Sequence, residues 1–174
     1  NRVVALRDGT MGWHLAGYEL ERDQSRVAPK VSARGLERAN AVTERVAARF
    51  AVPYVSLEEL EDFRDEVDAR SLFVMDVRSP AEFKKGHVPD SRCAPGGQLV
   101  QATDEYVGVR NARLVLVDDT GVRATSTASW LIQMGWSEVY VLDVGVDQLP
   151  RVDGGESSVA LSYSNTAVHQ ISVG

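Results

Sequence analysis

Residues 114–136, LVLVDDTGVRATSTASWLIQMGW, decide the fold of this chain. The stretch opens with four consecutive apolar residues, a pattern typical of a strand that is buried on both faces of a parallel sheet. Residues 118–121 are typical of a tight loop, and from Val122 the apolar residues recur at helical spacing until Gly135. This predicts a strand, a loop and a helix, with backbone N–H groups and the positive end of the helix dipole at the loop. Such a loop suits an anion, or a nucleophile that reacts as an anion.

The rest of the chain alternates short apolar runs with amphipathic segments. Besides residues 114–117, strands are predicted at residues 54–55, 72–77, 91–94 and 139–142. Helical spacing or capping residues predict helices over residues 36–50, 57–67 and 98–107, and Ser79 and Pro80 predict the start of a short helix at residues 79–82. This alternation predicts an α/β fold in which helices cover both faces of a parallel central sheet.

Composition narrows the function classes. The 174 residues suffice for one domain with flanking material, and the net charge of −6 argues against nucleic acid or an anionic membrane as partner. No apolar run approaches the roughly 20 residues that a membrane span requires. The single cysteine, Cys93, excludes an internal disulfide and favours a reducing, cytoplasmic compartment. The three scattered histidines form no metal-ligand pattern, and we expect neither a metal nor a cofactor.

Two segments of the chain share a short pattern. Residues 3–9, VVALRDG, have Val, Leu and Gly at the same spacing as residues 139–145, VYVLDVG. Such a repeat predicts that the first segment is the end of another unit and does not join the central sheet.

Two further motifs resemble a known family. DVRSPAEF at residues 76–83, followed by GHVP at residues 86–89, resembles the first signature of the rhodanese, or sulfurtransferase, domain. The second signature of that family is a loop of the form Cys-x-x-Gly-x-Arg-Ala after a central strand, and residues 118–124, DDTGVRA, are similar to it. The resemblance covers about residues 54–149 and implies a rhodanese-like three-layer α/β fold. It also implies an active-site loop of Asp118, Asp119, Thr120, Gly121, Val122 and Arg123.

The loop differs from the family pattern at its first residue. In active members the first loop residue is a cysteine, whose thiolate accepts a sulfane sulfur from a donor such as thiosulfate and passes it to a thiophilic acceptor. Asp118 occupies that position here. A carboxylate cannot form a persulfide, and with Asp119 beside it the loop would repel an anionic donor. We therefore expect no intact catalytic residue in this domain.

Several residues have a structural and a functional interpretation. Cys93 is either a small buried side chain, which we favour, or a substitute nucleophile. One of Asp118 and Asp119 is expected to cap the helix or accept loop N–H bonds; an acid–base or cation-binding role for the pair is the alternative. Arg123 is expected to form a salt bridge to one of these two aspartates. Asp76 and Arg78 match the family's Asp-x-Arg and are expected to brace the strand ends.

The resemblance implies a piece of a tandem-rhodanese protein. Residues 1–17 would be the remnant of a preceding unit, residues 18–53 a linker with a helix, residues 54–150 the rhodanese-like domain, and residues 151–174 a linker or the start of a further unit. The expected partners are neighbouring rhodanese-like units, with any small sulfur-donor anion bound elsewhere.

Three functions remain open from the sequence. The first is a sulfurtransferase protein in which this domain is a silent pseudoenzyme unit, and the second is a non-catalytic binding or regulatory module. The third, a phosphatase-like reaction, is disfavoured because the loop has the short rhodanese length and no cysteine.

Overall fold

The computed structural model describes residues 3–22 and 29–153, and the chain divides into two compact units, Asn1–Ser32 and Ala33–Gly174. In the first unit a turn closed by the Gly9 N–H and the Leu6 carbonyl leads into α1 (Gly9–Leu15). Trp13 packs on Tyr18 and donates its indole N–H to the Glu19 carbonyl. No residue of α1 is buried.

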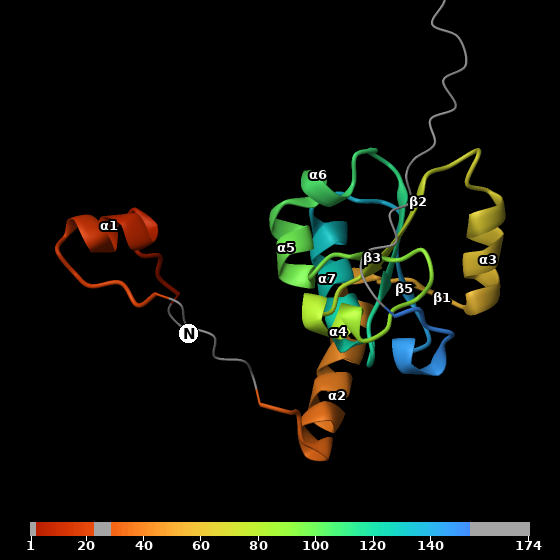
Figure 1. Cartoon of the computed structure of the whole chain (residues 1–174), viewed down its shortest axis with the longest axis horizontal. Coiled ribbons are helices and arrows are strands. Elements are labelled where there is room, and N and C mark those ends of the chain that lie inside the picture. The colour runs from red at the N-terminus through yellow and green to blue at the C-terminus, as the bar shows by residue number, and fades with distance from the viewer. Residues whose placement is uncertain (1–2, 23–28, 154–174) are drawn as a thin grey trace, which may run out of the picture. The chain divides into compact units, whose positions relative to one another are not determined.

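The second unit is built on a five-stranded parallel sheet (Figure 1). Its strands are β1 (Tyr54–Val55), β2 (Leu72–Asp76), β3 (Arg92–Cys93), β4 (Arg113–Val117) and β5 (Val139–Leu142), in the order β1-β5-β4-β2-β3. The predicted α/β fold with a parallel sheet is therefore confirmed, and β4 is its central strand. The prediction that residues 3–6 stay outside this sheet is confirmed as well.

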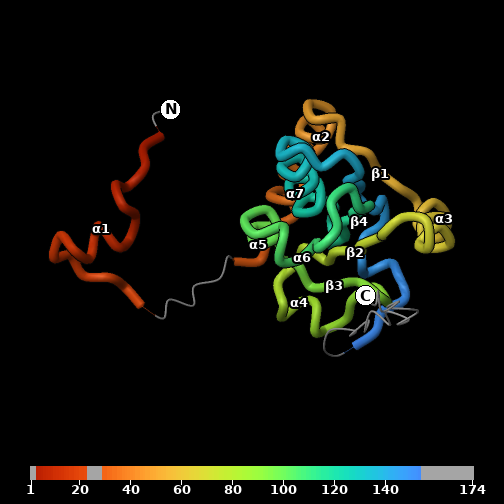
Figure 2. Tube along the Cα trace, turned by 90° about the horizontal axis from the view of Figure 1, so that it is seen from above, coloured from red at the N-terminus to blue at the C-terminus, as the bar shows by residue number. Residues whose placement is uncertain are grey.

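Helices cover both faces of the sheet, which makes three layers. On one face α2 (Ala33–Phe50) and α5 (Gly96–Gln101) pack against α7 (Val122–Gln133), and α6 (Thr103–Tyr106) follows α5. On the other face lie α3 (Leu57–Asp65) and the short 3-10 helix η1 (Val146–Gln148). Figures 1 and 2 both show α3 on the opposite side of the sheet from α5 and α7.

The alternating side chains of β4 fill both cores. Leu114 and Leu116 enter the cluster beneath α7, whereas Val115 and Val117 enter the cluster beneath α3. All four side chains are fully buried, as the unbroken apolar run predicted.

Two of the predicted helices, α3 and α4 (Pro80–Lys84), begin with a capping box. The Ser56 hydroxyl accepts from the Glu59 N–H at the start of α3, and Ser79 and Glu82 do the same at α4. In each case the glutamate returns a bond to the backbone N–H of the serine. Pro80 occupies the first turn of α4, where its missing N–H costs nothing.

The predicted helix over residues 98–107 is wrong as a continuous element. It is two short helices, α5 and α6, because the backbone at Ala102 leaves the helical region at φ −138° and ψ 56°. The Thr103 hydroxyl donates to the Leu99 carbonyl over 2.7 Å and takes the acceptor that a continuing helix would use.

The helix of the predicted linker is part of the second unit. α2 packs on α7, and Ala47 and Val52 are buried in the cluster that also contains Leu131 of α7. None of the helices in residues 3–22 and 29–153 combines the length and the apolar character needed to cross a membrane.

Candidate functional site

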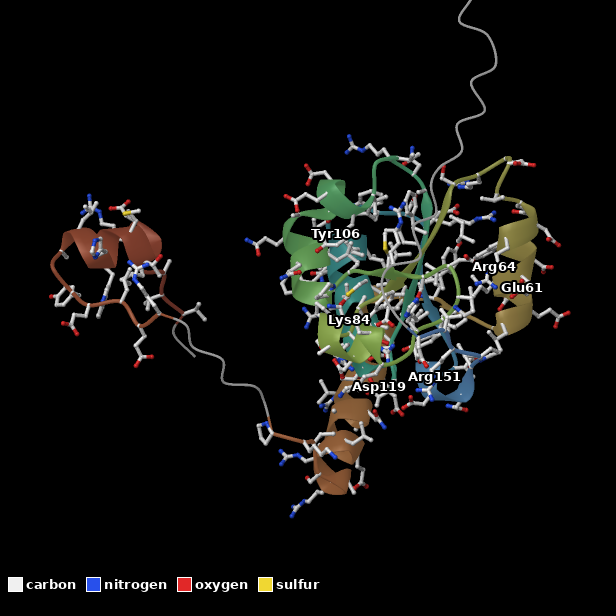
Figure 3. All side chains as sticks on the ribbon, in the orientation of Figure 1. Glu61, Arg64, Lys84, Tyr106, Asp119 and Arg151 are labelled. Atoms are coloured by element: carbon white, nitrogen blue, oxygen red, sulfur yellow. The ribbon has the colours of Figure 1, made fainter. Side chains whose placement is uncertain are left out.

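The candidate site lies where the carboxyl ends of β2, β4 and β5 meet. The Val77 N–H donates to the Val117 carbonyl over 3.0 Å, so the segments that leave β2 and β4 run together. The turn after β5 holds the loop from the other side, because the Val146 N–H donates to the Asp118 carbonyl over 2.9 Å. Gly145 lies against the Asp119 carbonyl, where a Cβ atom would be 2.5 Å from that oxygen. Figure 3 shows Asp119 at the end of the domain where α4 lies, with Tyr106 toward the other end.

The Asp118 carboxylate occupies the centre of the loop. One oxygen accepts from the Gly121 N–H over 2.5 Å, and the other accepts from the Arg123 N–H over 2.9 Å. The side chain is only 1% exposed. The expectation that one aspartate accepts loop N–H bonds is thus confirmed, and that aspartate is Asp118.

Burial raises the pKa of the Asp118 carboxyl, and the two backbone hydrogen bonds and Arg123 oppose this rise only in part. The backbone donors that could bind an anion therefore already bind a carboxylate of the chain. The N-cap position of α7, Gly121, has φ 76°, a conformation that glycine adopts without strain.

Arg123 links the loop to α4. Its guanidinium donates to both oxygens of Glu82, over 2.9 and 3.1 Å, and to Asp119 over 2.8 Å. The hydrogen bonds from Arg123, helped by those from Ser79, lower the pKa of Glu82 to about 2 although burial opposes them. For Arg123 itself burial disfavours the charge, but the bonds to Glu82 and Asp119 outweigh it and raise its pKa.

The expected salt bridge of Arg123 to an aspartate is confirmed for Asp119, and its Nε atom also lies 3.8 Å from Asp118. The sequence interpretation missed Glu82 as a member of this site. The Ser79-x-x-Glu82 capping box contained the signal, since it places a carboxylate at a helix start just after β2, at the same sheet edge as the loop.

Asp76 and Arg78 form a buried ion pair behind the loop. The Arg78 side chain contacts Asp76 at 2.7 Å and donates to the Gly86 carbonyl over 2.8 Å. Burial opposes the charge of Arg78, but the contacts with Asp76 more than offset it and raise the pKa of Arg78. The pair joins the end of β2 to the turn after α4, as its expected bracing role requires.

Comparison with known proteins identifies the family of this chain. The family model described as Rhodanese-like domain matches residues 56–149, more than half of the chain. The chain belongs to the rhodanese family.

Curated proteins that are similar to this chain are named thiosulfate sulfurtransferase GlpE. The protein from Pseudoalteromonas translucida is 23% identical over 95 residues, which cover 55% of this chain and 86% of that protein. The protein from Pseudomonas aeruginosa is 35% identical over 77 residues, which cover 42% of this chain and 66% of that protein.

A solved structure is more similar. The crystal structure of a thiosulfate sulfurtransferase from Pseudomonas aeruginosa is 47% identical with a TM-score of 0.79. The match covers 86% of this chain but only 28% of that chain, so this chain spans little more than a quarter of the solved relative.

Cys93 lies in the rhodanese sheet and not in the loop. It belongs to the edge strand β3, where it pairs with Asp76, and Asp76 pairs on its other side with Val117. Two strand spacings therefore separate the backbone of Cys93 from that of Val117, about 10 Å. Cys93 is half-buried and not fully buried as expected, and its place in the edge strand keeps it out of the loop.

A pocket of about 580 Å³ opens beside the loop. The loop residues 119–121 and the turn after β5 form part of its lining, and α2 contributes Leu36, Asn40, Thr43 and Glu44. Tyr54 and Thr125, whose hydroxyl oxygens are 2.9 Å apart, also line it. The family motifs do not point to the α2 residues of this lining, because α2 lies outside residues 56–149, which match the family model. Among the described residues, no group of His, Cys, Asp and Glu side chains has the geometry to hold a metal ion.

Proposed function

We propose that this rhodanese-like domain is a catalytically silent unit of a sulfurtransferase-family protein. The observation that carries the proposal is the Asp118 carboxylate, which stands at the family's cysteine position and accepts the Gly121 and Arg123 N–H bonds. A persulfide forms when a thiolate attacks a sulfane sulfur and displaces sulfite. A carboxylate provides no sulfur for this bond.

Charge supports the same proposal. An incoming thiosulfate dianion would meet the carboxylates of Asp118, Asp119 and Glu82, while the nearby guanidinium of Arg123 already binds Asp119 and Glu82. Like charges in a partly desolvated loop disfavour the donor. We therefore expect the chain to release no thiocyanate from thiosulfate and cyanide above the background rate.

The variant Asp118→Cys tests whether the missing thiol explains the silence. We expect it to acquire measurable persulfide, detected as a mass gain of one sulfur, because the Gly121 and Arg123 N–H groups then face a thiolate. Asp118→Cys with Asp119→Ala should take up more sulfur, since one repelling charge is gone. The matched control is Asp118→Ser, which has oxygen in place of the sulfur of that variant and should stay inactive.

Two outcomes would contradict the proposal. Turnover by the unchanged chain that disappears in Cys93→Ser would make Cys93 the nucleophile. A folded Asp118→Cys, Asp119→Ala double variant whose new thiol never gains sulfur would show that the loop has lost more than its cysteine.

The pocket beside the loop favours a second function, that of a non-catalytic binding or regulatory module. Its volume of about 580 Å³ is within the range of small-ligand sites. Ligand binding in this pocket would need no nucleophile. The two functions differ in whether sulfurtransferase activity accompanies this domain: such activity in another unit of the same protein supports the first, and its absence together with ligand binding by this domain supports the second.

A further inference from the structure

The outer face of α2 carries four exposed arginines. The opposite face packs on α7 and buries Ala47. At about 100° per residue, the arginines fall within about 60° of one another around the helix axis. They are Arg34, Arg38, Arg45 and Arg49, and we call them the arginine row. Figure 1 shows the N-terminal end of α2 extending beyond the neighbouring elements of the second unit.

The arginine row destabilises the helix that carries it. Its members form two pairs at a spacing of four residues, where like charges repel each other. Arg34 also lies in the first turn, beside the positive end of the helix dipole. Within residues 3–22 and 29–153 no carboxylate forms an ion pair with the row, although the Arg49 guanidinium lies 5.3 Å from the centre of the Phe50 ring. The row therefore lacks a counter-charge within the unit, which favours an anionic partner.

A second row of charges on α2 indicates which kind of anion fits. Glu37 and Glu44 lie beside the arginine row, on the same exposed side of the helix. Between the two rows lie Ala41 and Ala48, whose small side chains leave room for the backbone of another helix. A nucleic-acid backbone or an anionic membrane would also meet the glutamates. A partner helix can instead present carboxylates along one edge and face the glutamates with cations along the other.

We propose that the arginine row docks a helix of a partner protein whose carboxylates repeat at spacings of 4, 7 and 4 residues. This is the spacing of the row itself, and because it is the same in both directions, the partner can run parallel or antiparallel to α2. Each guanidinium then donates to a carboxylate in a charge-assisted and frequently bidentate contact. The surface lies outside residues 56–149, which match the family model, and the inference does not depend on the silence proposed for the loop.

A synthetic helical peptide of the length of α2 is the probe. Its glutamates have spacings of 4, 7 and 4 residues, and fluorescence anisotropy measures its binding to the full chain. A second peptide has the same composition, with its glutamates spread around the helix. We expect the first peptide to bind at least about fivefold more tightly at low salt, since several ion pairs form together. This preference should shrink as the salt concentration rises.

Two double variants separate the row from the overall charge. Arg38→Gln with Arg45→Gln removes the centre of the row, and we expect it to abolish the preference for the first peptide. This variant should melt no lower than the unchanged chain, because it removes repulsion within α2. The control, Lys84→Gln with Arg110→Gln, removes two exposed cations from other parts of the domain and should keep the preference.

Equal binding of the two peptides, or no binding of either, overturns the proposal. So does an equal loss of preference in both double variants, because the overall charge would then explain it. Tighter binding of single-stranded RNA, or of vesicles of phosphatidylcholine and phosphatidylserine, than of the first peptide would assign the row to a polyanion instead of a protein helix. A chain that sediments as a dimer, and as a monomer after Arg38→Gln with Arg45→Gln, would assign the row to a second copy.

Discussion

Asp118 and Glu82 are two carboxylates at one loop whose pKa values move in opposite directions. Burial raises the pKa of Asp118, whereas the hydrogen bonds from Arg123 lower that of Glu82 to about 2. A raised carboxyl pKa stabilises the fold at low pH, and this contribution disappears as the pH rises through the folded pKa. A lowered carboxyl pKa stabilises the fold at high pH, and this contribution disappears as the pH falls through the folded pKa. The two residues thus affect acid stability with opposite signs.

Glu82→Gln isolates the ion pair with Arg123, because glutamine can still complete the capping box with Ser79. The contribution of Glu82 is present above its ordinary pKa of 4.5 and is lost as the pH falls toward about 2. We expect the variant to lower the free energy of unfolding by about 1 kcal/mol at pH 7, since the pair is partly exposed and screened by solvent. Urea unfolding at pH 7 and near pH 2 should show this difference shrinking in acid.

Glu59→Gln is the matched control for that change. In the described residues the Glu59 carboxylate bonds only to Ser56 of its own capping box, and it is exposed. Its effect should be smaller than that of Glu82→Gln. Equal losses in the two variants would mean that the capping box, and not Arg123, accounts for the effect.

At the level of elements, the contact between α5 and α7 depends on a glycine. A Cβ atom at Gly96 would overlap the Thr127 hydroxyl, which itself donates to the Arg123 carbonyl over 2.8 Å. The helix that carries the loop arginine therefore packs closely against the backbone of α5.

We expect Gly96→Ala to lower the free energy of unfolding by about 1–3 kcal/mol through overpacking. Gly97→Ala is the control, because no atom lies within 4 Å of a Cβ there, and it should be neutral or stabilising by up to about 1 kcal/mol. Thermal unfolding of both variants checks this, and adding Thr127→Ala should recover part of the loss at Gly96. If Gly96→Ala and Gly97→Ala behave alike, α5 can move away from α7 at no cost.

The elements that follow from local chemistry could be predicted from the sequence. The strand at β4 follows from four adjacent apolar residues, and the starts of α3 and α4 follow from serine and glutamate three positions apart. The break between α5 and α6 was missed because it depends on a single hydroxyl of Thr103.

The site was predicted only where its residues are adjacent in the chain. The loop residues 118–123 and the Asp76–Arg78 pair fall within short motifs, and the contact of Arg123 with Asp119 spans one helical turn. The contact of Arg123 with Glu82 joins residues 41 positions apart, and the α2 wall of the pocket comes from outside the family signatures. Such contacts follow from the arrangement of elements and leave no periodic pattern in the sequence.

For the whole molecule, the boundary of the folded unit at α2 has a measurable consequence. A chain that begins at Ala33 should unfold at the same urea concentration as the full chain, because the second unit is then complete. A chain that begins at Pro53 loses Ala47, Phe50 and Val52 from the core and uncovers α7. We expect it to lose at least about 3 kcal/mol of unfolding free energy.

Urea unfolding followed by circular dichroism compares the three chains. Equal stability of the chains that begin at Ala33 and at Pro53 would show that α2 is a tether and not part of the fold. A loss of stability already at the Ala33 start would mean that residues 1–32 contribute to the second unit.

The aspartate in the loop also changes how this domain responds to oxidants. A loop thiolate can be oxidised by peroxide through sulfenic to sulfonic acid, and each step alters its charge and its hydrogen bonds. The Asp118 carboxylate takes no part in that chemistry, and the one thiol of the chain, Cys93, belongs to a strand of the sheet. The loop therefore keeps one charge and one geometry through oxidative conditions that would inactivate a persulfide-forming loop. The surface that this loop presents is therefore the same with and without an oxidant.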